Sequence, residues 1–267
     1  MSEILQSLIL GIVQGLTEFL PVSSSGHLEI TKFLLGDESL AEESLAMTVA
    51  LHVATALSTV VVFRKEIASL IRDFSLDTQK GSLPYFFKIA ITMVPAAFIG
   101  FFFEDKMAVL FDGKLLLVGF MLLITAALLF IADSIKRNHR EVSYKDSIII
   151  GLAQAFALLP GISRSGSTIC TALIFNIKRE EAARFSFLIV LPLILGKGIL
   201  DVREMIQGNY VLMESGISLT VGFIAAFITG VIACKWMIAL VKSANLKWFG
   251  IYCLVIGISL ILYNTVF

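Results

Sequence analysis

The sequence contains few charged residues, and this scarcity limits the kind of protein it can form. Only 16% of its 267 residues are charged and 57% are hydrophobic, and the mean hydropathy is +0.90. A soluble domain of this length cannot bury so much apolar surface, so the composition predicts a polytopic membrane protein. The formal net charge of +0 gives nucleic-acid binding no electrostatic support.

Cysteine, tryptophan and nucleotide-binding motifs are also scarce or missing. Cys170, Cys234 and Cys253 lie far apart in apolar runs, without metal-site or disulfide spacing, and we interpret them as packing residues. The sequence has 21 Phe but only two Trp, so few Trp side chains are available to anchor helices at the membrane interface. The absence of a G-x-x-x-x-G-K-[ST] loop excludes a P-loop pump. Glu3 stands where a signal peptide is basic, so we expect the N-terminus to stay in the mature protein.

The apolar residues fall into six stretches that are long enough, or nearly so, to cross a bilayer core of roughly 30 Å. They are residues 47–63, 84–103, 115–132, 183–200, 217–240 and 248–267. Two further stretches, 4–20 and 147–160, are shorter and run into clusters of Pro, Gly and Ser. Irregular backbone is tolerated at membrane depth only against protein or a water-filled cavity. The sequence therefore predicts an all-α integral membrane protein, one domain over residues 1–267, with two re-entrant helix-loop-helix segments lining a cavity.

The distribution of Lys and Arg predicts the orientation in the membrane. Residues 64–83, 133–146 and 235–247 are rich in these cations, whereas 104–114 and 201–216 are poor. Because Lys and Arg are enriched in cytoplasmic loops, we expect both termini on the outer side.

The two polar loops are near-duplicates in sequence. Residues 11–28 read GIVQGLTEFLPVSSSGHL and residues 151–168 read GLAQAFALLPGISRSGST. A shift of 140 residues superimposes Gly11 on Gly151, Gln14 on Gln154, Ser23 on Ser163, Ser25 on Ser165 and Gly26 on Gly166. Combined with the orientation, the duplication predicts inverted repeats of approximately residues 1–132 and 140–267, whose loops meet near the bilayer midplane.

The positions at which the loops differ predict the chemistry. The first loop has Glu18, Ser24 and His27 where the second has Leu, Arg164 and Ser. Ionisable residues inside membrane segments are costly and mark functional sites. Each also has a purely structural interpretation: Glu18 at the membrane interface, His27 as a hydrogen-bonded core residue, and Arg164 as a tie between helices.

Together these residues indicate a site for a phosphate that is attached to a lipid. Ser- and Gly-rich turns at helix N-termini offer backbone N–H groups to an anion, and Arg164 adds a planar fork that suits phosphate. Breaking a phosphoanhydride also requires a nucleophile, Ser24 or Ser25, and a general base or acid, His27. Glu18 either orients His27 or holds a hard cation.

Further residues are expected to contact the substrate. They are Gln14, Ser23, Ser25, Gly26, Ser163, Ser165, Gly166 and Thr168. His52, in the apolar stretch MTVALHVAT, is either adjacent to this site or a packing residue.

Two segments, QGLTEFLPVSSSGH at 14–27 and LPGISRSGST at 159–168, resemble the signature regions of the bacterial undecaprenyl pyrophosphate phosphatase family, which is associated with bacitracin resistance. The resemblance extends over nearly the whole chain in length, hydropathy and motif placement. It implies hydrolysis of a polyprenyl diphosphate to polyprenyl phosphate and inorganic phosphate, which recycles the lipid carrier of peptidoglycan synthesis. It also implies a multi-pass protein of the bacterial inner membrane with its site facing the outer side.

Matched onto this sequence, the family pattern implies Glu18 as the essential acid, Ser24 as the nucleophile, and Arg164 as the phosphate-binding arginine, with His27 as the motif histidine. The family's acidic motif (E/Q)xxxE begins here with Gln14. With Gln14 in place of a glutamate, the motif supplies one carboxylate, which makes a metal site built from two carboxylates less favourable. A magnesium or calcium ion at Glu18 is therefore an expectation that rests on the resemblance.

The alternative function is a membrane transporter or flippase of polyprenyl phosphate or another anion, because secondary transporters often contain inverted repeats with broken helices. His27 beside the serines favours the hydrolase, since a carrier needs a phosphate clamp but neither nucleophile nor base. The expected partners are the lipid substrate and membrane lipids, without nucleic acid. The sequence leaves open the isoprenoid length, a phosphoserine intermediate and the oligomeric state, a homodimer included.

Overall fold

Helices make up almost the whole structure. The computed structural model describes residues 2–36, 43–74, 82–103, 110, 114–135, 139–206, 215–242 and 245–266. Within these ranges there are eleven helices and no strands, which confirms the all-α class. The helices are α1 (Glu3–Phe19), α2 (Ser24–Leu35), α3 (Glu43–Val62), α4 (Arg64–Arg72), α5 (Leu83–Phe102), α7 (Leu115–Ser134), α8 (Tyr144–Phe156), α9 (Arg164–Ile174), α10 (Arg179–Ile206), α11 (Gly216–Lys242) and α12 (Lys247–Val266).

Five of these helices, α5, α7, α10, α11 and α12, are long and apolar enough to cross a membrane. The pair α3 and α4 raises the number to six if it is counted as one bent span. These elements coincide with the six apolar stretches of the sequence, so the chain is a multi-pass membrane protein. The helices extend beyond several predicted stretches because their first and last turns carry charges, as at Arg179 and Arg203 in α10.

Residues 64–83 lie between two predicted spans, where we expect a cytoplasmic loop, but the first half of this segment is helical. Residues 64–72 form α4, which turns from α3 by 71° at Phe63. The sequence RKEIASLIR is amphipathic, with apolar residues at helical spacing and cations at both ends. Its low hydropathy hides such a helix from a search for membrane spans.

The short apolar stretches 4–20 and 147–160 form α1 and α8, each followed by a tight turn and a second short helix. Ser23 caps α2 by accepting a hydrogen bond from the Gly26 N–H at 3.3 Å, and Ser163 caps α9 by accepting one from the Gly166 N–H at 3.0 Å. Each cap satisfies an N–H group that has no partner inside its helix. The two polar loops therefore end in the same local motif.

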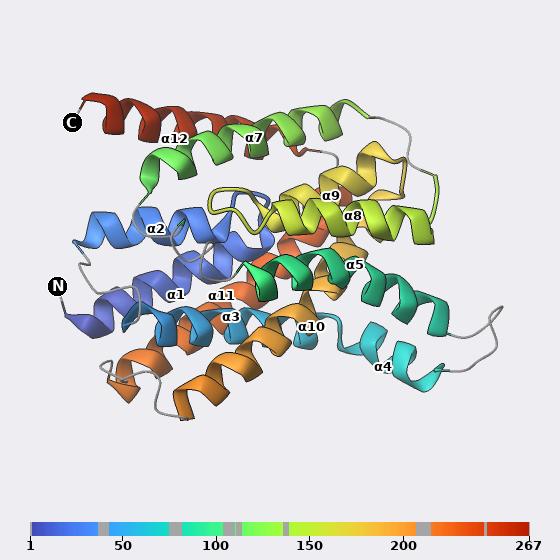
Figure 1. Cartoon of the computed structure of the whole chain (residues 1–267), viewed down its shortest axis with the longest axis horizontal. Coiled ribbons are helices and arrows are strands. Elements are labelled where there is room, and N and C mark those ends of the chain that lie inside the picture. The colour runs from blue at the N-terminus through green and yellow to red at the C-terminus, as the bar shows by residue number, and fades with distance from the viewer. Residues whose placement is uncertain are drawn as a thin grey trace.

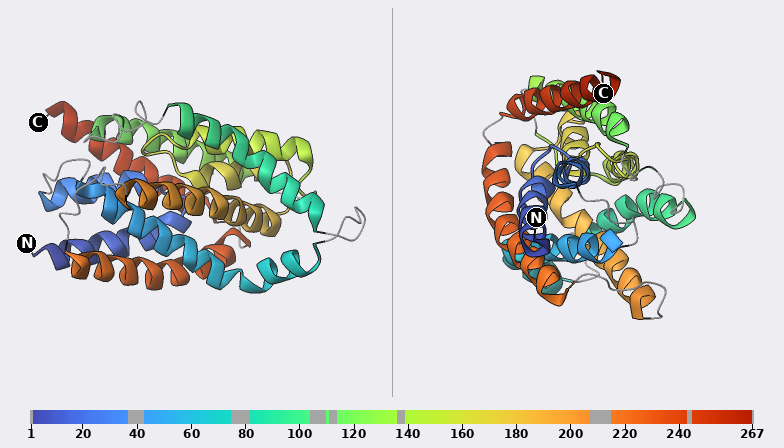
Figure 2. Two further views of the ribbon diagram at one scale, coloured as in Figure 1. Left: turned by 60° about the horizontal axis from the view of Figure 1, so that its bottom comes forward. Right: turned by 90° about the vertical axis from the view of Figure 1, so that its left-hand side faces the viewer.

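Both chain termini lie at one end of the bundle, and α4 lies at the other (Figures 1 and 2). The helix α1 enters from the end with the termini, whereas α8 enters from the end with α4 (Figure 1). Each of these helices packs against a long helix from the other half of the sequence, α1 against α11 and α8 against α5. The two halves are thus interleaved around the hairpin loops.

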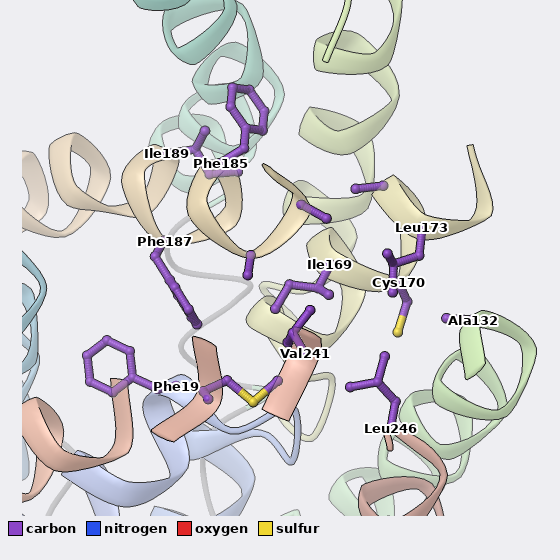
Figure 3. Close-up of a cluster of buried hydrophobic side chains, with 14 of the residues drawn as sticks. Phe19, Ala132, Ile169, Cys170, Leu173, Phe185, Phe187, Ile189, Val241 and Leu246 are labelled. Atoms are coloured by element: carbon purple, nitrogen blue, oxygen red, sulfur yellow. The ribbon is translucent and has the colours of Figure 1, made fainter. Parts of the chain in front are cut away.

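Buried aromatic and aliphatic side chains surround the loops. Phe19, the last residue of α1, is 2% exposed and packs edge-on against Phe187 of α10, with ring centroids 5.7 Å apart. Figure 3 shows this pair beside Ile169 and Cys170 of α9 and Val241 of α11. The contact between Phe19 and Phe187 fixes the end of α1 against α10.

The close approach of α1 and α11 predicts a large effect for one methyl group. A Cβ atom on Gly11 would lie 2.4 Å from the Gly222 carbonyl oxygen, a backbone atom that cannot swing away. We expect Gly11→Ala to lower the free energy of unfolding by about 1–3 kcal/mol, as overpacking does in other cores. Thermal unfolding in detergent measures the change.

The matched control for this prediction is Gly196→Ala in α10, where a Cβ atom meets no atom within 4 Å. Its unfolding midpoint should stay at or above the wild-type value because Ala favours helix. Equal midpoints for the Gly11 and Gly196 variants would contradict the role of this helix crossing.

Candidate active site

The structure brings the two polar loops into direct contact, and the contact is reciprocal. A Cβ atom on Gly26 would lie 3.2 Å from the Gly161 Cα, and one on Gly166 would lie 3.3 Å from the Pro21 Cβ. The shift of 140 residues that relates the loops exchanges these two contacts. In addition, the Ser165 hydroxyl donates a hydrogen bond to the Leu20 carbonyl at 3.1 Å. The Gly-rich sequences are thus required where two backbones approach closely.

Each loop is held from outside by a long helix. The Thr125 hydroxyl of α7 donates to the Gly161 carbonyl at 3.2 Å and accepts the Ser163 N–H at 3.1 Å. The Cys253 thiol of α12 points at the Pro21 carbonyl, with sulfur and oxygen 3.8 Å apart. These bonds satisfy buried carbonyl groups that the turns leave without backbone partners.

Glu18 is the centre of the polar network. Its carboxylate is 6% exposed and forms an ion pair with Arg164, with Nη2 and Oε1 2.5 Å apart. Its second oxygen, Oε2, accepts hydrogen bonds from the Ser24 hydroxyl at 2.6 Å and from the Gln14 amide at 3.1 Å. One carboxylate therefore joins residues from α1, α2 and α9 into a single site.

Arg164 has spare capacity to bind an anion. Its side chain is 19% exposed, and its Nη1 atom is buried without a hydrogen-bond partner among the described residues. Since a buried donor without a partner is costly, such a group indicates a ligand that supplies the acceptor. Arg164 is also the first residue of α9, so the guanidinium and the positive end of that helix act at the same place.

His27 is engaged at both ring nitrogens. Nδ1 lies 2.8 Å from the Ser23 carbonyl, which only accepts, so Nδ1 carries the proton. Nε2 lies 2.7 Å from the Tyr252 hydroxyl of α12. In a neutral ring, Nε2 accepts a hydrogen bond from that hydroxyl. The Ser24 hydroxyl bonds to Glu18 and has no bond to His27. The structure therefore pairs Ser24 with the acid, where the sequence offered His27 as the base.

The bond from His27 supports a strained turn. Ser23 has a φ of 72°, a left-handed backbone conformation that residues other than glycine rarely adopt. Its counterpart Ser163 has φ −73°. Because such strain persists only when the surroundings enforce it, the His27 bond to the Ser23 carbonyl helps to hold the backbone that presents Ser24.

The remaining predicted residues lie around this centre with different partners. The Ser25 hydroxyl is 3.4 Å from that of Ser23, and the Ser165 hydroxyl is 3.3 Å from that of Ser163. Thr168 instead faces α10, where its hydroxyl lies 2.5 Å from that of Ser186.

Two further residues near the site carry weak or no sequence signals. His52 on α3 donates through Nδ1 to the Thr48 carbonyl at 2.8 Å and lies close enough to Glu18 to interact with its charge. Tyr252 was missed because it is one aromatic residue in an apolar helix, distant in sequence from both loops.

The donors available for a divalent cation are few and are hard oxygens. Among the residues that the structure describes, no three His, Cys, Asp or Glu side chains cluster as a metal site would require. Gln14 Oε1, next to Glu18, is buried and has no described partner. Mg²⁺ often binds through one or two carboxylates together with substrate phosphates. The Glu18 carboxylate and Gln14 Oε1 are the oxygen donors that would hold such a cation here.

Comparison with known proteins identifies the family of this chain. The family described as bacitracin resistance protein BacA matches residues 7–259. A protein of Christiangramia forsetii named undecaprenyl-diphosphatase is 50% identical over 98% of both chains. Proteins of the same name from Bacteroides fragilis and Methanococcus vannielii are 48% and 38% identical, over 98% and 97% of this chain and 98% and 100% of their own. By sequence, length and motif, this chain belongs to the BacA family of bacitracin resistance proteins.

Proposed function

We infer that this chain is an undecaprenyl-diphosphatase, which hydrolyses undecaprenyl diphosphate to undecaprenyl phosphate and inorganic phosphate. This reaction recycles the lipid carrier of peptidoglycan synthesis. The observation that carries the proposal is the half-buried Arg164 guanidinium next to Glu18, which accepts a hydrogen bond from Ser24. Its Nη1 atom is buried and has no hydrogen-bond partner among the described residues. The site thus combines a phosphate-binding group, Arg164, with the Ser24 hydroxyl, which already donates a hydrogen bond to the Glu18 carboxylate.

The diphosphate binds between the two loops. Arg164 Nη1 donates to a phosphate oxygen, and the N-terminal turns of α2 and α9 add backbone N–H groups and positive helix ends. Groups fixed in this way stabilise the negative charge that phosphoryl transfer places on the equatorial oxygens. The lipid tail leaves the site toward the membrane.

Ser24 is the nucleophile, and Glu18 takes its proton. The Ser24 oxygen attacks the terminal phosphorus while its proton passes to Glu18 Oε2 along the existing 2.6 Å bond. The bond from that phosphorus to the bridging oxygen breaks, and undecaprenyl phosphate leaves with the electron pair. Water then attacks the phosphorus of the phosphoserine, and the bond between the Ser24 oxygen and phosphorus breaks. The Ser24 oxygen takes back the proton from Glu18, and inorganic phosphate is released.

A divalent cation is a further part of the proposal. Glu18 and Gln14 Oε1 are the residues that would hold it, together with oxygens of the substrate. Magnesium or calcium at that place would neutralise part of the diphosphate charge.

Ser24→Ala should remove nearly all turnover, because it deletes the attacking atom. Arg164→Ala should lower kcat by roughly 10³-fold, as expected for the loss of a fixed donor to the transition state. Phosphate release from undecaprenyl diphosphate by the purified protein in detergent measures both effects.

Ser25→Ala is the matched control, since the Ser25 hydroxyl contacts only Ser23 in this network. It should retain activity within about tenfold of wild type. Equal losses in the Ser24 and Ser25 variants would overturn the assignment of the nucleophile. Tight lipid binding by the wild type without phosphate release, with magnesium or calcium added, would favour the flippase instead.

We propose that His27 is a positioning residue that Tyr252 orients, on the strength of its two hydrogen bonds. The Tyr252 hydroxyl fixes the tautomer, and Nδ1–H then holds the Ser23 carbonyl. The ring acts on the reaction through the turn and does not take the proton of Ser24.

His27→Asn should retain at least about tenfold more activity than His27→Ala, because the Asn amide can replace the Nδ1 donor but is not a base. Tyr252→Phe should lower kcat and leave the pH dependence of kcat/KM unchanged. Phosphate release across a pH series tests both. If the Asn and Ala variants are equally inactive, His27 takes part in proton transfer and the positioning role fails.

We also propose that the chain is an inverted repeat with re-entrant hairpins, α1–α2 entering from outside and α8–α9 from the cytoplasm. The exchanged contacts of Gly26 and Gly166 support this symmetry. The common position of both termini, opposite the Lys- and Arg-rich segments, supports an outer location for the N- and C-termini (Figure 1).

Cysteine labelling tests this orientation. The native cysteines are buried, so an added surface cysteine can be labelled selectively. Ser2→Cys and Thr265→Cys should react with a membrane-impermeant maleimide in intact spheroplasts, whereas Arg72→Cys should react only after permeabilisation. The opposite pattern would reverse the proposed topology, and labelling of all three in intact spheroplasts would contradict it.

A further inference from the structure

A polar pocket of about 280 Å³ lies at the bend between α3 and α4. It is lined by Val61, Val62, Arg64, Lys65, Glu66 and Lys235. It therefore joins the end of α3 and the start of α4 to α11. Figure 1 shows α4 at the end of the bundle opposite the termini.

The charge of this pocket is not balanced by the protein. Arg64, Lys65 and Lys235 are exposed and form no ion pair within the described part of the chain. Glu66 is the single acid in the lining, so the pocket carries a formal excess of two positive charges. Other basic residues of the same end behave differently, since Arg140 is paired with Asp146.

The depth of the pocket in the membrane follows from its neighbours. One face of α4 packs on the core through Ile67 and Leu70, while Ile71 is 64% exposed. Trp236, next to Lys235, is 54% exposed. Exposed Trp is typical of the headgroup region, and an amphipathic helix with cations and exposed apolar residues lies in the plane of that region.

We propose that this pocket binds the phosphate headgroup of an anionic phospholipid from the leaflet that surrounds α4. The cations contact the phosphate, and the exposed Val61 side chain on α3 provides an apolar surface for the start of an acyl chain. A free phosphate would pair with the cations but would leave the apolar Val61 surface without a contact. The proposal needs the membrane position of α4 and does not depend on the hydrolase mechanism.

Fluorescence quenching can test the site directly. The sequence has two Trp, so Trp248→Phe leaves Trp236 as the single emitter beside the pocket. The protein in neutral detergent micelles is titrated with acyl-brominated phosphatidylglycerol or with the equally brominated phosphatidylcholine. We expect half-maximal quenching by phosphatidylglycerol at a mole fraction about tenfold lower, since each cation near an anionic lipid adds measurably to binding. Equal curves for the two lipids would overturn the proposal.

Charge removal locates the effect. In the same background, Arg64→Gln, Lys65→Gln and Lys235→Gln together should abolish the preference for phosphatidylglycerol. The control combines Lys145→Gln, Lys178→Gln and Lys247→Gln, which removes the same charge at or next to the first residues of α8, α10 and α12. It should keep the preference. Loss in both triple variants would show a diffuse charge effect and no site.

Two further measurements cover misfolding and the source of the phosphate. Phosphate release from undecaprenyl diphosphate should be unchanged in the Arg64, Lys65 and Lys235 triple variant. If the triple variant has lost this activity, Lys235→Gln alone should weaken the preference for phosphatidylglycerol severalfold. NaCl should reduce the wild-type preference because exposed charges are screened. Inorganic phosphate at millimolar concentration should not abolish it, and full competition by phosphate would identify a soluble anion as the ligand.

Discussion

The ion pair between Arg164 and Glu18 is the interaction on which the site depends. It joins the two loops through residues 146 positions apart in the sequence and places opposite charges in a largely buried position. A buried charge without a partner is strongly destabilising, so each residue fixes the loop that carries the other. A diphosphate can then take over part of the arginine's coordination, while Glu18 stays close to Ser24. The pair therefore balances the two charges at the place where, in the proposed function, the diphosphate binds.

Hydrogen bonds around that pair give each serine hydroxyl a different partner. Ser23 and Ser163 are used as helix caps, and Ser165 is bonded to the Leu20 carbonyl. Ser24 alone among these serines donates to Glu18. The strained backbone of Ser23 directs the next residue toward the acid. A cluster of chemically equal serines thus becomes a set of residues with distinct tasks.

The sequence predicted the six apolar stretches, the two short helices and the polar loops because hydropathy and duplication are local properties of the chain. It missed α4 because a nine-residue amphipathic helix has low hydropathy. It also offered His27 as the partner of Ser24, since neighbours in sequence were the natural choice. The bond from Ser24 to Glu18 depends on how the chain turns at Pro21, and the bond from His27 to Tyr252 spans 225 residues. Neither follows from spacing.

The interleaving of the halves has a consequence for the origin of such a chain. If either half formed a homodimer with the same architecture, its two loops would be identical. One dimer would hold two copies of Glu18 and no loop arginine, and the other would hold two copies of Arg164 and no matching acid. Joining the halves in one polypeptide allows the loops to diverge to opposite charges. In the proposed mechanism the single reactive centre requires this difference between the loops, and one polypeptide that contains both halves provides it.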